Sequence, residues 1–218
     1  MFQWTEKYQP QQDWVTFIIV LIFMLCVVLF RNNTHRFKLL VSFWEFRSYI
    51  NIYDKEKFSN PLHYFNLILT LISLTSFSVM VYFFYDKLLM SMFGKLSFLT
   101  FLTFISGVVI GRYWILRLIF KVSGNLELFQ QTVFRSLSLY VTISLHGLLL
   151  FSFYYYRFFY EPNLLLILLI FIFCALFVSH LSIYLKIIGM KFDYSIYLIL
   201  YLCAFKLAPW LWLYHSIF

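Results

Sequence analysis

Apolar residues occupy six long runs of the sequence, separated by shorter polar stretches. The runs cover residues 14–30, 62–85, 96–120, 132–153, 162–185 and 194–217. A helix needs about 20 mainly apolar residues to cross the hydrocarbon core of a bilayer, within a range of about 17–25. Each run satisfies that requirement. The pattern therefore predicts an all-α polytopic membrane bundle of six transmembrane helices, forming a single integral membrane domain over residues 1–218.

The polar segment 31–61 is the one stretch long enough to hold further structure between the predicted spans. Within it, residues 36–50 (RFKLLVSFWEFRSYI) predict a helix lying on the membrane, because apolar side chains recur there at helical spacing. They form two stripes, one of Leu39, Phe43, Phe46 and Ile50 and one of Phe37, Val41 and Trp44. A simple interfacial helix needs one apolar face. The second face predicts packing on this chain's own bundle or on a partner, with Phe43, Trp44, Phe46 and Arg47 as candidate contacts.

Composition narrows the class of protein further. Hydrophobic residues make up 63% of the 218 residues, charged residues make up 12%, and the mean hydropathy is +0.84. Soluble domains usually have about 45–50% apolar and about 25% charged residues. These values exclude a soluble enzyme, a disordered chain and a disulfide-rich secreted module. The three cysteines lie inside apolar runs without a CxxC pair, so we expect packing residues.

The net charge of +8 predicts orientation rather than nucleic-acid binding. Twelve of the 17 lysines and arginines lie in or beside the first, third and fifth loops between the runs. The opposite side has four, Lys7, Lys87, Lys95 and Arg157, and Lys206 lies inside the last run. Cytoplasmic loops carry the excess of positive charge. The odd-numbered loops are therefore predicted to be cytoplasmic, with both termini outside.

Three segments carry a resemblance to a known family. They are residues 36–64 (RFKLLVSFWEFRSYINIYDKEKFSNPLHY), 112–124 (RYWILRLIFKVSG) and 198–209 (LILYLCAFKLAP). Together they resemble an uncharacterised family of small bacterial inner-membrane proteins, known as a domain of unknown function. The resemblance implies a bacterial inner membrane, and it brings no activity, substrate or cofactor.

Ionisable residues inside spanning helices are functional candidates because their burial in hydrocarbon is costly. The candidates here are Arg112, Arg117, His146, His180 and Lys206. A haem held by His146 and His180 is disfavoured, because their positions along the predicted helices differ in depth by about 12 Å. Each histidine is better explained by a hydrogen bond to a neighbouring helix.

Neither transport nor catalysis has a strong signal in the sequence. All nine acidic residues lie in loops or at the ends of runs, whereas proton-coupled transport usually uses an intramembrane carboxylate. Lys206 beside Pro209 keeps a transporter open as an alternative. No GxSxG or HExxH motif is present. We therefore expect no catalytic site, no cofactor and no metal.

Helix packing gives the clearest signals. Thr103, Gly107 and Gly111 recur at four-residue spacing, which lets two helix backbones approach closely, either inside the bundle or against a partner. Polar residues also align on two runs, Asn66, Thr70 and Ser73 on the second and Arg135, Thr142 and His146 on the fourth. We expect these two sets to meet in a polar seam that holds the two helices together.

Two functions from different classes follow. The first is a non-catalytic integral subunit or accessory protein of a larger inner-membrane complex, such as one for protein export or envelope biogenesis. Its partners would be membrane lipids and other integral membrane proteins. The alternative is a small transporter or lipid-handling protein that uses intramembrane Lys206 and His146.

Overall fold

The structure is a computed structural model that describes residues 13–42, 44–54, 60, 63–89, 94, 96–122, 126–158 and 161–188. Within these residues all regular structure is helical. The elements are α1 (Asp13–Asn32), α2 (Thr34–Val41), α3 (Phe46–Tyr53), α4 (Tyr64–Phe84), the short π-helix η2 (Tyr85–Leu89), α6 (Phe98–Val122), α7 (Leu126–Arg157) and α8 (Pro162–Ile188). The all-α prediction is thus confirmed for the described part of the chain.

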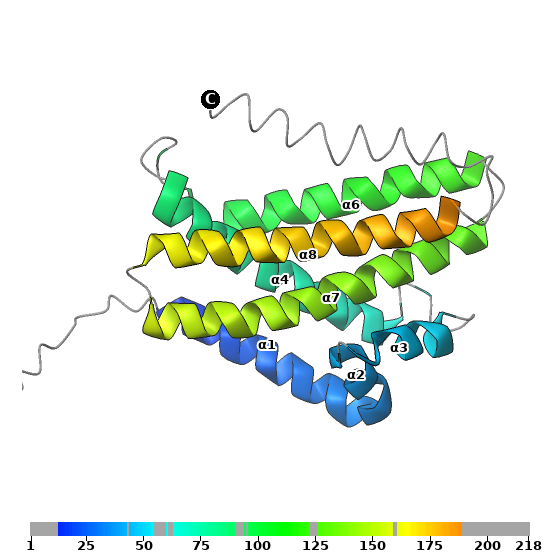
Figure 1. The fold of residues 1–218 in the computed structure, drawn as a ribbon, viewed down its shortest axis with the longest axis horizontal. Coiled ribbons are helices and arrows are strands. Elements are labelled where there is room, and N and C mark those ends of the chain that lie inside the picture. Colours follow the sequence, from blue (N-terminus) through cyan, green and yellow to red (C-terminus); the bar gives the residue numbers. More distant parts are fainter. Residues whose placement is uncertain are drawn as a thin grey trace, which may run out of the picture.

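The long helices form a bundle, and the two loop helices lie at one end of it. In Figure 1, α2 and α3 lie beside the end at which α1 finishes, and α4 and α7 pass through the middle of the bundle. α4 packs against α7, α1 and α6, while α7 also packs against α6 and α8. The core is therefore built around α4 and α7, and α2 contacts α7 directly.

Among the residues that the structure describes, four helices are long and apolar enough to cross a membrane, namely Trp14–Asn32, Tyr64–Lys87, Phe98–Val122 and Phe129–Arg157. Helix α8 covers the fifth predicted span, and its apolar part Asn163–Ser179 is shorter. The sixth predicted span, residues 194–217, lies outside the described residues. The first five predicted spans thus each contain a helix, and four of them have the length and composition of a membrane span.

The single helix predicted over residues 36–50 is wrong, because the structure divides this segment into α2 and α3. Asn33 caps the start of α2, since its side chain accepts a hydrogen bond from the backbone N–H of Arg36. At Ser42 the backbone becomes extended, and the Ser42 N–H donates to the Lys38 carbonyl, which ends α2. Helix α3 then begins at Phe46 in a new direction (Figure 1).

Small side chains pack the centre of the bundle. Helices α4 and α7 carry buried serines, which are Ser73, Ser76 and Ser78 on α4 and Ser136, Ser138 and Ser144 on α7. Their hydroxyls donate to carbonyls three or four residues earlier in the same helix. Gly147 is packed more tightly still, because a Cβ there would lie 3.0 Å from Ile172 Cδ1 and 3.4 Å from Met80 Sδ. Small residues thus bring α7 close to both α4 and α8.

Candidate functional site

A buried arginine lies at the centre of the polar contacts between the loop helices and the bundle. Arg36, on α2, is only 1% exposed. Its Nη2 donates to Oδ1 of Asn66 on α4 over 3.0 Å, and Asn66 is equally buried. The Asn66 amide nitrogen donates in turn to the carbonyl oxygen of Asn60 over 2.8 Å. The Arg36 side chain thus links α2 to Asn66 in the first turn of α4, and Asn66 links α4 to the backbone of Asn60.

Aromatic rings surround the same guanidinium. Its carbon Cζ lies 4.0 Å from the centre of the Phe65 ring, 5.1 Å from that of Tyr53 and 6.0 Å from that of Phe134. These rings come from α4, α3 and α7 respectively. A cation over a ring face is stabilised by the ring quadrupole, and more strongly where water is excluded. Arg36 therefore contacts three other elements of the fold.

An ion pair fastens the end of α3 to α7. Arg135 on α7 donates from Nε to Oδ2 of Asp54 over 2.8 Å, and its Nη2 contacts the same oxygen. The Arg135 side chain is 16% exposed and that of Asp54 is 9% exposed, so water screens the pair only weakly. A further bond joins α7 to α2, because the Thr142 hydroxyl donates to the Leu40 carbonyl over 3.0 Å.

We call Arg36, Asp54, Asn66, Arg135 and Thr142 the buried polar cluster. Each of its hydrogen bonds described above, apart from that to Asn60, joins a loop helix, or the residue directly after it, to α4 or α7. Within the part of the chain that the structure describes, no three His, Cys, Asp or Glu residues could hold a metal ion. The hydrogen bonds and the ion pair of the cluster form a clamp that fixes α2 and α3 against the bundle.

Tyr49 lies within this region with its hydroxyl buried. The residue is 0% exposed, and its ring stacks on Phe134 at a centroid distance of 5.7 Å. The hydroxyl makes no hydrogen bond of ordinary geometry, although Arg36 and Ser138 lie near it. Burial raises the pKa of Tyr49 above its ordinary value, and the charge of Arg36 offsets part of that rise.

Replacing Tyr49 by phenylalanine is expected to change the free energy of unfolding at pH 7 by less than about 1 kcal/mol, because the hydroxyl has no strong bond to lose. At alkaline pH the variant should gain stability relative to the unsubstituted protein. Since the folded-state pKa of Tyr49 is raised, the unfolded chain releases this proton first above about pH 10. Stability should then fall as pH rises toward the folded-state pKa, and Tyr49→Phe removes that contribution.

Thermal unfolding in detergent at pH 7 and at alkaline pH measures both effects. Tyr64→Phe is the matched control, because Tyr64 is 50% exposed. A large loss of stability for Tyr49→Phe at pH 7 would show instead that the buried hydroxyl is hydrogen-bonded.

The loop residues proposed as contacts have different surroundings. Phe46 is half-buried against the core, whereas Arg47 is exposed on the outer side of α3. Trp44 lies in the turn between α2 and α3 and is 92% exposed. Phe43 lies outside the described residues. The apolar side of both loop helices thus packs on the chain's own bundle, and Trp44 and Arg47 remain at the surface.

The intramembrane candidates also differ from one another. Arg112 on α6 donates to the Tyr140 hydroxyl on α7, and its guanidinium carbon lies 5.2 Å from the centre of the same ring. His146 is exposed on α7, with Nδ1 2.7 Å from the carbonyl oxygen of Thr142. Arg117 is exposed on α6. The side chain of His180 and the whole of Lys206 lie outside the described residues.

The predicted polar seam between the second and fourth spans is wrong in its pairing. Arg135 and Thr142 bind Asp54 and the Leu40 carbonyl, which belong to the loop. On α4, the hydroxyls of Thr70 and Ser73 donate to carbonyls of their own helix. The loop helices take the polar partners that the sequence had assigned to a contact between two spans.

The predicted small-residue face on α6 is not packed inside the described bundle. A Cβ built at Gly107 or at Gly111 meets no described atom within 4 Å. Among the described glycines, Gly147 on α7 is the closely packed one, and the sequence does not mark it because no second small residue lies four positions away on its face.

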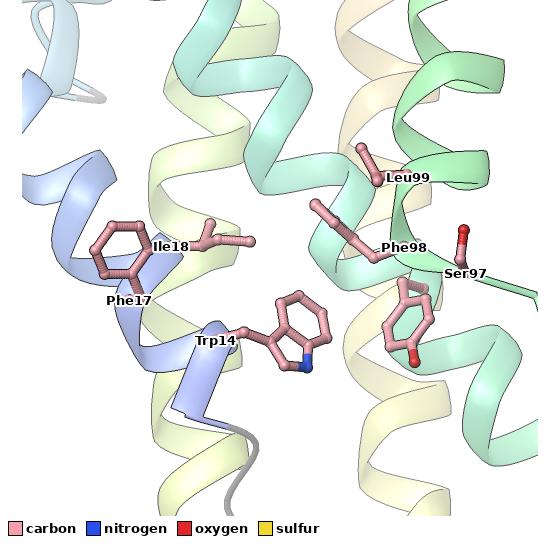
Figure 2. Close-up of a pocket in the computed structure, with 7 residues that line it drawn as sticks. Trp14, Phe17, Ile18, Ser97, Phe98 and Leu99 are labelled. Atoms are coloured by element: carbon pink, nitrogen blue, oxygen red, sulfur yellow. The ribbon is translucent and has the colours of Figure 1, made fainter.

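An open apolar groove lies at the other end of the bundle from the polar cluster. Its lining residues are Trp14, Phe17, Ile18, Tyr82, Ser97, Phe98 and Leu99 (Figure 2). The Trp14 ring lies 5.0 Å from that of Phe98 and 5.4 Å from that of Tyr82, between centroids. Aromatic residues of this kind are typical of the membrane–water interface, and here they join α1 to α4 and α6.

The described part of the chain is all-helical, and its long apolar helices indicate a membrane-embedded protein. A family described as Domain of unknown function (DUF4271) matches residues 15–217. The chain belongs to this family, and the resemblance to a family of unknown function is confirmed. Comparison with curated proteins and with solved structures gave no match.

Proposed function

We propose that the protein is a non-catalytic integral subunit or accessory protein of a larger bacterial inner-membrane complex, with both termini on the periplasmic side. The charge distribution supports the orientation, because the basic loops are the odd-numbered ones. The loop helices then lie on the cytoplasmic side. There the buried polar cluster holds α2 and α3 as a fixed surface that carries the exposed Trp44 and Arg47.

The observation that carries the proposal is the position of His146. The span Phe129–Arg157 has its midpoint at residue 143, so His146 lies about 4.5 Å beyond it along the helix axis. The residue is exposed, and so are Leu149, Leu150 and Phe153 on the same side of α7. A polar ring facing hydrocarbon at this depth is costly. Contact with a helix of another protein removes that cost.

The chemistry of the contact follows from the ring of His146. Its Nδ1 lies 2.7 Å from the carbonyl oxygen of Thr142, which can only accept a hydrogen bond, so Nδ1 is the donor. In a neutral ring, Nε2 is then an acceptor for a second hydrogen bond. A partner helix with a hydroxyl or amide donor at the same depth would bind it.

The test is purification of the tagged protein from native membranes in mild detergent, followed by mass spectrometry and native sizing. We expect an unrelated integral membrane protein to be recovered in stoichiometric amount. His146→Leu should weaken its retention roughly 3- to 20-fold, which corresponds to an interhelical hydrogen bond of about 0.6–1.7 kcal/mol.

Phe171→Leu on α8 is the control, because Phe171 is also exposed but apolar. Recovery of a lone monomer of 26.5 kDa, or of a homodimer of twice that mass, would overturn the proposal. That result would favour the alternative, a small transporter or lipid-handling protein that uses Lys206 and His146.

A further inference from the structure

Helix α6 presents an uncovered face along most of its length. In its most apolar stretch only 6% of the residues are buried, against 56% in α7. Phe104, Val108 and Trp114 on this face are 69%, 56% and 66% exposed, and Gly107 and Gly111 lie between them. The face is therefore long, apolar and shallow at its centre, which is the shape that accepts another helix.

The chain has one segment of suitable length and position to cover this face. Helix α8 ends at Ile188, at the same end of the bundle as Val122, where α6 ends (Figure 1). Thirty residues follow Ile188, and 24 of them form the apolar run 194–217. As a helix, that run would be about 36 Å long, close to the length of α6 and sufficient to cross a bilayer.

Small residues in the two segments match in depth. Gly111 and Gly107 lie 11 and 15 residues before Val122, so their distances from that end are about 16 and 22 Å along the axis. Ala204 and Ala208 lie 10 and 14 residues after residue 194, which gives about 15 and 21 Å. Antiparallel packing therefore places Ala204 opposite Gly111 and Ala208 opposite Gly107.

The charges of the two segments are compatible with the same arrangement. Lys206 lies two residues from each alanine, and a step of two residues turns a helix by about 200°. Packing through the alanines thus turns Lys206 away from α6 and from Arg112, which lies at a similar depth. A helix rotated by half a turn would direct Lys206 toward α6 at about the depth of Arg112.

We propose that residues 194–217 cross the membrane as a helix and pack antiparallel on the face of α6 that contains Gly107 and Gly111. A second copy of the chain is the competing occupant. The chain's own segment has the advantage of a covalent link of only five residues, 189–193, which gives it a high effective concentration at this end of the bundle.

Disulfide cross-linking of the full chain in native membranes tests the proposal. Cys26, Cys174 and Cys203 are first replaced by serine, and a protease site is inserted between Arg157 and Pro162. Two cysteine pairs are then made separately, Gly111→Cys with Ala204→Cys, and Gly107→Cys with Ala208→Cys. The control pair is Gly111→Cys with Lys206→Cys. Position 206 lies at nearly the same depth as Gly111, but on the opposite side of the segment from the two alanines.

We expect both matched pairs to hold the two proteolytic fragments together until reduction, at least ~5-fold more than the control, because a disulfide requires Cα separations of about 4.4–6.8 Å. Oxidised dimers of intact chains would instead show that a second copy occupies the face. Equal cross-linking of the control, or none in either matched pair, would equally overturn the proposal. Because the two pairs are independent, loss of one variant through misfolding leaves the other to decide.

Discussion

Replacing Arg36 by methionine is expected to lower the free energy of unfolding by about 2–4 kcal/mol. Methionine can fill the space of the arginine stem, but it cannot donate to Asn66, whose buried Oδ1 then loses this bond at a cost of about 1–3 kcal/mol. It also loses the contact of the cation with the Phe65 ring, worth about 0.5–2 kcal/mol. Thermal or denaturant unfolding in detergent measures the change.

The control for this prediction is Arg47→Met, the same substitution on the exposed side of α3. It should change stability by no more than about 0.5 kcal/mol. Arg36→Lys separates charge from shape, because lysine keeps the positive charge but lacks the planar fork of donors. Similar losses for Arg36→Met and Arg47→Met would show that Arg36 does not support the fold.

The sequence predicts the long helices well because the thickness of the bilayer limits their length. The run 96–120 corresponds to α6 (Phe98–Val122), and the run 62–85 corresponds to α4 with the first residue of η2. Prediction is poorer where a helix continues beyond the apolar region. Helix α7 extends from Leu126 to Arg157, whereas the apolar run covers only 132–153, because its ends contain residues that hydropathy alone assigns to loops.

Periodicity fails in the loop because it does not register a change in backbone direction. Leu39 and Ile50 follow a helical repeat, and both pack against the core, yet the extended backbone at Ser42 places them on separate helices. Two short helices in different directions can both direct apolar residues toward one core. The second apolar stripe, which suggested a second contact surface, partly reflects this turn.

The centre of the candidate site could not be found from residue type. An arginine in a basic loop is fully explained by the positive-inside rule, so nothing marks Arg36 as buried. The polar pattern of the second span marks Asn66, but it predicts a partner on another span rather than on the loop. The pairing depends on how the loop folds back, and a sequence pattern without long-range contacts does not contain that information.

Breaking the ion pair between Asp54 and Arg135 is expected to destabilise the attachment of α3 to α7 strongly. Asp54→Ala should destabilise the protein by about 2–4 kcal/mol, because it leaves the mostly buried Arg135 guanidinium without its carboxylate. Arg135→Met should have a similar effect through the isolated Asp54, whose Oδ1 already has no hydrogen-bond partner. Glu45→Ala is the matched control, since Glu45 is an exposed carboxylate in the same loop.

A double-mutant cycle isolates the pair from other effects of the substitutions. Because removing both charges leaves neither one buried and unpaired, the double variant should be more stable than the sum of the two single losses predicts, by at least ~1 kcal/mol. Strictly additive losses would show that the two residues act independently. A positive coupling would mean that α3 is bound to α7 by charge as well as by packing. Trp44 and Arg47 would then belong to a surface as rigid as the bundle, as a docking site for another subunit requires.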